Sequence, residues 1–235
     1  MKKDKLIPKR RFKEFKNNEA WEQRKLNEVS NYRNGKAHEN NIDEKGKYVV
    51  VNSKFVSTDG KVRKFSNKQN EPLLKNEIAF VLSDVPNGRA IARTFLIEKD
   101  GKYTLNQRIA GITPLENTDP YFLYILMNRH SYFLQFDDGA KQTNLSKQDV
   151  EKFESFYPDI AEQTKIGSFF ADLDNLITLH QRKLKKLKEL KLAYLSEMFP
   201  EEGEKYPKRR FAGFTEPWEQ RKVKDIFKVT RGHVL

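Results

Sequence analysis

The sequence predicts an α+β protein: a globular mixed α/β domain, built from a small twisted sheet with helices, followed by one long α-helix. Two observations carry this prediction. Short β-rich runs separated by Gly and Asn turns recur within residues 21–157, and an apolar repeat of alternating four- and three-residue steps runs from Ile166 to Met198 within residues 159–199. A basic lead (residues 1–20) precedes the domain, and residues 200–235 are expected to form a linker and the start of another domain.

The long helix carries a coiled-coil seam. Asp159 can cap its start together with Glu162, and Pro200 stops it, which gives a rod of roughly 60 Å at about 1.5 Å per residue. Polar His180 and Lys191 are either tolerated at an exposed end or set the register of pairing with another helix. The seam consists of Ile166, Phe170, Leu173, Ile177, His180, Leu184, Leu187, Lys191, Tyr194 and Met198.

Within the domain, strands are expected over residues 48–52, 54–57, 77–82, 90–97 and 108–113, in a mostly antiparallel sheet. Asp119-Pro120 is typical of a helix start and predicts an apolar helix that runs to Asp137-Asp138-Gly139. Ser146 and Asp149 predict the cap of a short helix, and residues 153–157 resemble a strand.

Composition narrows the class of protein. No run of eighteen apolar residues occurs and the basic N-terminus lacks an apolar segment, so we expect a cytoplasmic protein without a membrane span or signal peptide. With no cysteine and only four scattered histidines, neither disulfides nor a metal site is expected.

The net charge of +12 favours a polyanionic partner, most simply nucleic acid. Residues 1–25 carry ten Lys or Arg against four acidic residues, and residues 182–191 carry six against one. The alternative interpretation of these two runs is a solubilising tail and a solvated helix face.

An internal repeat is the strongest signal in the chain. The segment from Pro8, PKRRF, and the segment from Trp21, WEQRK, return in the same order from Pro207 and Trp218. A period near 200 residues is too long for a solenoid and indicates a duplicated domain whose second copy has only begun by Leu235.

The candidate catalytic motifs in the sequence are incomplete or have the wrong spacing. Pro158-Asp159 with Glu189-Leu190-Lys191 matches a loose PD…ExK nuclease pattern, but that Glu and Lys would lie about 200° apart around a helix. Asp119-Pro120-Tyr121-Phe122 lacks the second proline of a DPPY methyltransferase motif, and no glycine-rich loop follows a strand to hold S-adenosylmethionine. No grouping of Ser, His and Asp suggests a nucleophile. We therefore expect a protein that is not an enzyme.

The order of these elements resembles the specificity (S) subunits of type I restriction-modification enzymes. The residues that carry the resemblance are WEQRKLNEV from Trp21, Asn106-Gln107-Arg108, the loop 139–145, and the string from Pro158 through Glu162-Gln163 and Lys165-Ile166 into the basic leucine-rich helix and its closing MFP. In that family each DNA target recognition domain is followed by a spacer helix, two such units pair their helices antiparallel, and each domain reads half of a split DNA site.

The resemblance implies a non-catalytic adaptor without a cofactor of its own. Its expected partners are double-stranded DNA, methyltransferase (M) subunits that hold S-adenosylmethionine, and a restriction (R) subunit. Usual S subunits carry two domains and two helices, so this chain is expected to be a half-length form, natural or truncated. Two copies could pair their seams in an antiparallel coiled coil and read a gapped inverted repeat as a homodimer. The alternative is a coiled-coil dimeric DNA-binding regulator without methyltransferase partners.

Candidate DNA contacts are basic or amide side chains in the domain's loops. Arginine can pair with guanine, Gln and Asn with adenine, and Lys mostly with phosphate. Gly139, Lys141, Gln142 and Asn144 are the best cluster, because glycine permits close backbone approach while three side chains offer donors. For each candidate the alternative is a solvated loop residue, and Arg93 is expected to form a salt bridge from a strand. The other candidates are Lys36, Lys54, Arg63, Lys64, Asn87, Arg89 and Arg108.

Overall fold

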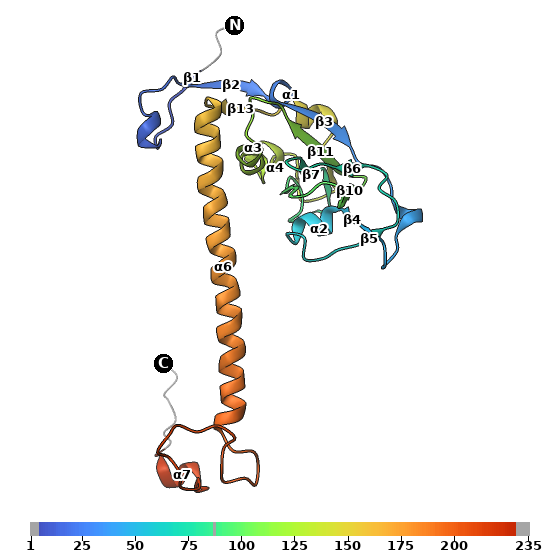
Figure 1. Ribbon diagram of the computed structural model, residues 1–235. Coiled ribbons are helices and arrows are strands. Elements are labelled where there is room, and N and C mark those ends of the chain that lie inside the picture. Colours follow the sequence, from blue (N-terminus) through green and yellow to red (C-terminus); the bar gives the residue numbers. More distant parts are fainter. Residues whose placement is uncertain (1–4, 87, 229–235) are drawn as a thin grey trace. The chain divides into compact units, whose positions relative to one another are not determined.

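Small sheets and one long helix make up the computed structural model, which describes residues 5–86 and 88–228 (Figure 1). The chain divides after Asp172 into two compact units. The strands are β1 (Lys5–Leu6), β2 (Trp21–Lys25), β3 (Ser30–Asn34), β4 (Tyr48–Val51), β5 (Phe65–Ser66), β6 (Pro72–Leu73), β7 (Ile78–Val81), β8 (Ser83–Asp84), β9 (Thr94–Leu96), β10 (Tyr103–Leu105), β11 (Ile109–Pro114), β12 (Thr143–Asn144) and β13 (Glu154–Tyr157). The α-helices are α1 (Leu26–Val29), α2 (Ser53–Ser57), α3 (Pro120–Met127), α4 (Ser131–Leu134), α5 (Lys147–Glu151), α6 (Ile160–Met198) and α7 (Val223–Ile226), with 3-10 turns at Lys13–Phe15 and Glu39–Asn41.

The described strands form three sheets and a ribbon, with orders β1-β2-β13, β5-β4-β10-β6, β3-β11-β7-β9 and β12-β8. The pairing of β4 with β10 is parallel, and the other strand pairs are antiparallel. This arrangement confirms the α+β class with small sheets and one long helix, although the strands are divided among several sheets instead of one.

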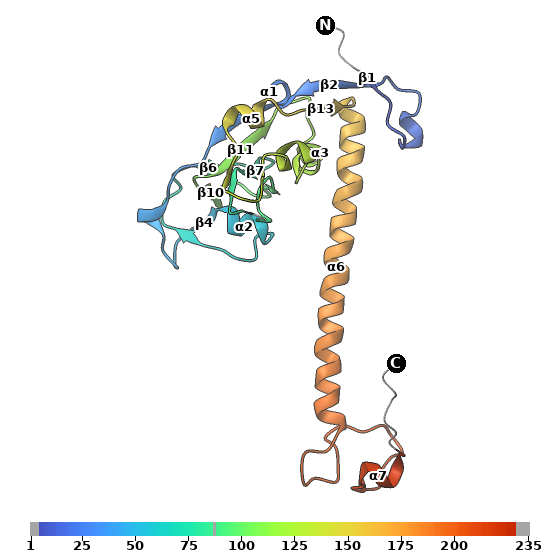
Figure 2. The ribbon, with the colours of Figure 1, turned by 180° about the vertical axis from the view of Figure 1, so that it is seen from behind.

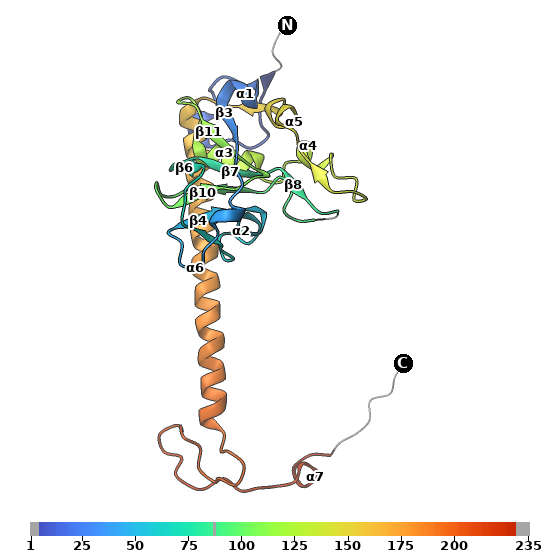
Figure 3. The same ribbon diagram turned by 90° about the vertical axis from the view of Figure 1, so that its right-hand side faces the viewer.

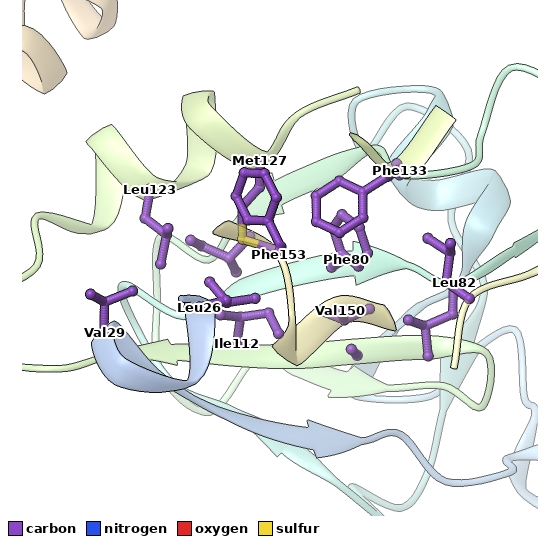
Figure 4. Packing of buried hydrophobic residues seen from close by; sticks show 14 of the residues in the cluster. Leu26, Val29, Phe80, Leu82, Ile112, Leu123, Met127, Phe133, Val150 and Phe153 are labelled. Atoms are coloured by element: carbon purple, nitrogen blue, oxygen red, sulfur yellow. The ribbon is translucent and has the colours of Figure 1, made fainter. Parts of the chain in front are cut away.

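Strand β7 lies between two apolar clusters. Its residues alternate between them: Ile78 and Phe80 pack in one cluster, and Ala79 and Val81 in the other. A strand covered on both faces needs a continuous apolar sequence, which explains the run EIAFVL from Glu77. Figure 4 shows the first cluster, where side chains from α1, α3 and α5 gather around the β7–β11 pair.

Helix α6 contains 39 residues and measures roughly 58 Å at about 1.5 Å per residue (Figure 2). The Glu162 amide donates to Asp159 Oδ1 at 2.8 Å, so Asp159 caps the helix as expected. The Glu162 carboxylate faces Arg11 instead of completing a capping box. None of the helices in the described part of the chain combines the length and the apolar character needed to cross a bilayer.

Two strand predictions were wrong in whole or in part. Residues 54–57 lie in α2, because the Asn52 side chain accepts the Phe55 amide at 2.9 Å and caps a helical turn. Of residues 90–97 only 94–96 form a strand, since Ala92 adopts a positive φ of 56° and the preceding residues turn. The cap and the turn outweigh the β-propensity of the intervening side chains.

The apolar helix predicted after Asp119 is broken in two. Asp119 Oδ1 accepts the Phe122 amide at 2.8 Å, as expected of an N-cap, but α3 ends at Met127. Arg129 has a φ of 54° and donates its amide to the Ala92 carbonyl at 2.8 Å, which ties the break to the core. The cap of α5 by Ser146 and Asp149 and the strand β13 are confirmed.

Candidate nucleic-acid interface

Two loops that are distant in sequence are brought together by the β8–β12 ribbon. Asn144 lies opposite Ser83 and Thr143 opposite Asp84 in this antiparallel pair. Gln142 Nε2 donates to Ser83 Oγ at 2.8 Å. The ribbon and the loops it joins extend from one side of the domain (Figure 3). We call residues 84–86, 88–91 and 137–142 the ribbon loops.

Asp84 organises the first ribbon loop. Its Oδ2 accepts the backbone amides of Ala90 at 2.6 Å and Ile91 at 3.1 Å, while Oδ1 accepts that of Val85 at 2.9 Å. Gly88 passes so close that a Cβ there would lie 2.0 Å from Asp84 Oδ2. The loop is therefore closed around a carboxylate, with the Arg89 side chain left exposed.

Two aspartates organise the second ribbon loop. Asp137 Oδ1 accepts the Gly139 amide at 3.1 Å, and Asp138 Oδ1 accepts the amides of Ala140 at 2.9 Å and Lys141 at 3.1 Å. The latter two backbone donors hold the pKa of Asp138 below its ordinary value, because they favour the charged carboxylate. Gly139 has a φ of 70°, a conformation that favours glycine.

Arg108 lies at the base of the ribbon. It has a φ of 66°, and its carbonyl accepts the amide of Leu82, the residue that precedes β8, at 3.0 Å. Lys36 is differently placed: its Nζ pairs with Glu71 Oε2 at 3.0 Å, although 65% of its side chain remains exposed. A lysine held by a carboxylate in this way is less available to a phosphate.

Three basic candidates belong to a second group around α2. Lys54 lies in α2, and Arg63 and Lys64 follow it on an exposed loop. Arg63 Nε donates to the Gly60 carbonyl at 2.8 Å, and the Lys64 carbonyl accepts the Val50 amide at 2.8 Å. The local fold thus orients these side chains from the sheet that contains β4.

The structure therefore groups some of the predicted contacts and separates others. Asn87 lies outside the described residues, and Arg93 donates from Nε to the Arg89 carbonyl at 2.7 Å from a turn, not from a strand. Among residues 5–86 and 88–228, no three His, Asp or Glu side chains gather in a way that could hold a metal ion. The side chains and backbone gathered at the ribbon are Arg89, Arg108, Gly139, Lys141, Gln142 and Asn144.

The seam predicted on α6 is largely exposed. Ile166 is the exception, because it packs against the domain's apolar cluster. Near the end of α6, Leu187, Tyr194 and Met198 line an apolar groove. The exposed apolar members of the seam are Phe170, Leu173, Ile177, Leu184, Leu187 and Tyr194.

Sequence reasoning missed the residues that support the site. Asp84 precedes Val-Pro-Asn-Gly, a turn signal that could have marked it as a loop-closing carboxylate. The ion pair between Arg11 and Glu162 spans 151 residues, and no local pattern in a single sequence points to it.

The family described as type I restriction modification DNA specificity domain matches residues 18–189. This match covers most of the domain and of α6, and the chain belongs to this family.

Solved structures share the fold. The S subunit of a type I restriction-modification system from M. genitalium is 18% identical with a TM-score of 0.59, and the match covers 83% of this chain and 49% of that one. The HsdS subunit from Thermoanaerobacter tengcongensis is 16% identical with a TM-score of 0.51 over 76% and 44%. A chain from a study of assembly and conformational transition of the type I R-M system is 14% identical with a TM-score of 0.56 over 74% and 43%. This chain spans about half the length of these structures.

Proposed function

We propose that this chain is a sequence-specific DNA-recognition subunit of a type I restriction-modification complex and reads one half-site. The observation that carries the proposal is the β8–β12 ribbon, which brings together exposed Arg89, Lys141 and Gln142 from its two loops and Asn144 from β12. A two-stranded ribbon has dimensions that fit the major groove of B-DNA, where Arg, Gln and Asn can read base edges.

The basic group around α2 has a different role in this proposal. Lys54, Arg63 and Lys64 contact phosphates and position the domain, since these exposed basic side chains lie away from the ribbon and supply charge to the DNA backbone. The net charge of +12 supports attraction to a polyanion.

We propose further that two copies pair through α6 as an antiparallel coiled coil. The exposed leucines of the seam support this, because a stripe of Leu173, Ile177, Leu184 and Leu187 is costly to leave in water. Antiparallel pairing would give a twofold dimer, and such a dimer reads an inverted repeat with a gap.

In this proposal the partner subunits, and not this chain, carry out catalysis. The chain binds no cofactor itself, docks methyltransferase subunits that hold S-adenosylmethionine, and joins a restriction subunit through the complex, in the cytoplasm. Residues 21–157 are the recognition domain, 159–199 the spacer helix, and 200–235 a linker with the opening of a second domain copy. The repeat of PKRRF and WEQRK supports this division.

Methylation mapping tests the proposal. The chain is co-purified with methyltransferase subunits from the same genome, and modified adenines or cytosines are mapped on genomic DNA with S-adenosylmethionine present. We expect a gapped inverted repeat, and neither methylation nor cleavage by the chain alone. A motif with unlike halves would overturn the homodimer, and specific DNA binding without any methyltransferase association would favour a dimeric regulator.

A further inference from the structure

The first turns of α6 are held by an unusual set of buried residues. Glu162 is 1% exposed and Gln163 is 3% exposed, and Gly167 is buried with them. Two polar side chains and a glycine provide little hydrophobic stabilisation, so their burial needs another physical reason. That reason lies in the directional contacts they make on two sides of the helix.

Residues of the N-terminal lead and Trp21 of β2 contact one side of the first turns of α6. Arg11 Nε donates to Glu162 Oε1 at 2.8 Å and Arg11 Nη2 to Oε2 at 2.6 Å, with Arg11's side chain only 5% exposed. Trp21 Nε1 donates to the same carboxylate at 3.3 Å. Phe12 stacks edge-on to Phe169 two turns further along, at 5.7 Å between ring centroids. A bidentate arginine fixes orientation as well as distance.

Residues at the start of α3 contact the other side of these turns of α6. Gln163 Oε1 accepts the Asp119 amide at 3.1 Å, and its Nε2 donates to the Pro158 carbonyl at 2.9 Å. A Cβ on Gly167 would lie 2.6 Å from Asp119 Oδ1 and 3.2 Å from the Phe122 amide nitrogen. The helix therefore packs at backbone distance here, where only glycine fits.

The residues of the lead and of β2 that contact the start of α6 recur in the internal repeat. Arg11, Phe12 and Trp21 correspond to Arg210, Phe211 and Trp218. In addition, WEQRK forms β2, which pairs with β13, the strand that leads directly into α6. The repeated segments PKRRF and WEQRK thus include residues that join the domain to α6.

The helical turn recurs in the second copy without the same surroundings, whereas the strand formed by WEQRK does not recur. Helix α7 corresponds to α1, yet Val223 and Ile226 are 65% and 54% exposed, whereas their counterparts Leu26 and Val29 are 1% and 3% exposed. Arg210 has one buried guanidinium nitrogen without a hydrogen-bond partner among the described residues.

We infer that Arg11, Trp21, Glu162, Gln163 and Gly167 form a joint that fixes the direction in which α6 leaves the recognition domain. Arg11 and Glu162 are positioning residues in this joint. This inference rests on the proposed function in one respect: if two domains read two half-sites, the joint also restricts the number of base pairs between them. If the joint is loosened, each domain can tilt on its helix, and the complex accepts half-sites that are separated by different numbers of base pairs.

The joint is tested first without DNA. The chain has no cysteine, so Lys61→Cys in the domain and Ser168→Cys on α6 allow two spin labels on exposed sites. Labelled chains are diluted with unlabelled chains, and the distance distribution is measured by pulsed electron resonance. We expect Glu162→Gln to widen the distribution at least twofold. Glu14→Gln is the matched control, since it breaks the exposed 3.2 Å pair with Lys165 on the same turns and should change nothing.

A second, milder variant keeps the test decisive if Glu162→Gln does not fold. Trp21→Phe removes the hydrogen bond to Glu162 but keeps an aromatic ring beside Phe122, and we expect it to widen the distribution less than Glu162→Gln. An unchanged distribution in both folded variants would overturn the joint.

The role of the joint in spacing is tested second. The reconstituted methyltransferase complex is assayed on DNA substrates whose half-sites are separated by one base pair more or one fewer than in the normal site. We expect Glu162→Gln to methylate the off-length substrates at least fivefold better relative to the normal one. A uniform loss on all gaps would mean a structural role only and would overturn the role in spacing. Absence of methylation by the unmodified chain would count against the proposed function and the spacing role, while the spin-label distances would still decide the joint.

Discussion

Gln142 and Ser83, 59 residues apart in the sequence, are joined by a 2.8 Å hydrogen bond from Nε2 to Oγ across the β8–β12 ribbon. The same Nε2 lies 3.3 Å from Asn144 Oδ1. An amide whose two N–H donors are held by neighbours is oriented before any ligand arrives, which lowers the entropic cost of a directional contact through its Oε1 acceptor.

We therefore predict that Gln142→Ala relaxes sequence preference at one position of the half-site. A lost amide–base contact costs about 1–3 kcal/mol of discrimination, or roughly 5- to 150-fold in relative methylation of the preferred base. Ser83→Ala keeps the amide but removes one of its acceptors, and we expect a smaller effect at the same position. An unchanged methylated motif in Gln142→Ala would show that this loop does not read bases.

Lys54→Ala should weaken binding to all sequences alike. Lys54 is exposed on α2, outside the ribbon, where it can reach phosphate but presents no fixed geometry to a base. The slope of log affinity against log salt should decrease by about 0.9, the value for one phosphate contact, with the methylated motif unchanged. Lys36→Ala is the comparison, since Lys36 is already paired with Glu71 and should change the slope less.

Local signals in the sequence were enough for the elements and not for the site. The seam, the Asp159 cap and Pro200 predicted a helix over 159–199, and α6 spans 160–198. Short β-rich runs bounded by turns also located β7 and β11, and a cap located α5, because these signals depend on neighbours in the chain. The pairing of β8 with β12 and of Arg11 with Glu162 depends on residues about 60 and 151 positions apart, and a single sequence holds no signal for such contacts.

Glu77 illustrates a buried charge whose role appears only in the fold. It is 3% exposed, accepts a hydrogen bond from Arg33 Nη2 at 2.6 Å and also accepts from the Leu74 amide at 2.7 Å and the Thr113 hydroxyl at 2.5 Å. Burial alone would raise the pKa of Glu77, but these donors outweigh it and hold the pKa below its ordinary value of 4.5. The charged form is thus the one the fold stabilises.

Glu77→Gln should lower the free energy of unfolding by about 2 kcal/mol at pH 7, less than for a fully buried pair because Arg33 is 29% exposed. A carboxylate with a depressed pKa stabilises the fold above the unfolded pKa, and this is lost as pH falls through the folded pKa. The difference between parent and variant in urea unfolding should therefore shrink below about pH 4.5. Glu98→Gln, at an exposed loop position, should show no such difference at any pH.

His130 should make the free energy of unfolding depend on pH in a second range, at higher pH than Glu77. Its Nδ1 accepts the Tyr132 amide at 3.2 Å and caps α4, and its ring packs on Phe153 at 4.8 Å between centroids. Burial lowers the pKa of His130 from its ordinary 6.5. Protonation would also convert the acceptor into a donor and break the cap.

Stability should accordingly fall as pH decreases below about 6.5, because the unfolded chain takes up the proton first. His130→Asn keeps a capping oxygen but cannot titrate in this range, so this part of the pH dependence should disappear. Urea unfolding of both proteins between pH 8 and pH 5 measures it. Parallel curves for parent and variant would contradict the assignment.

The seam on α6 leads to the last prediction, that Leu184→Asp with Leu187→Asp abolishes self-association. Both leucines are about half exposed and lie on the face defined by the four- and three-residue steps. Leu179→Asp with Leu192→Asp is the matched control, since these leucines are also exposed but lie about 100° or more from the seam around the helix. Burying two carboxylates between helices costs several kcal/mol, whereas the control places them in water. Sedimentation equilibrium should give a monomer for the first pair and a dimer for the second. A dimer in both would mean that α6 pairs through another face.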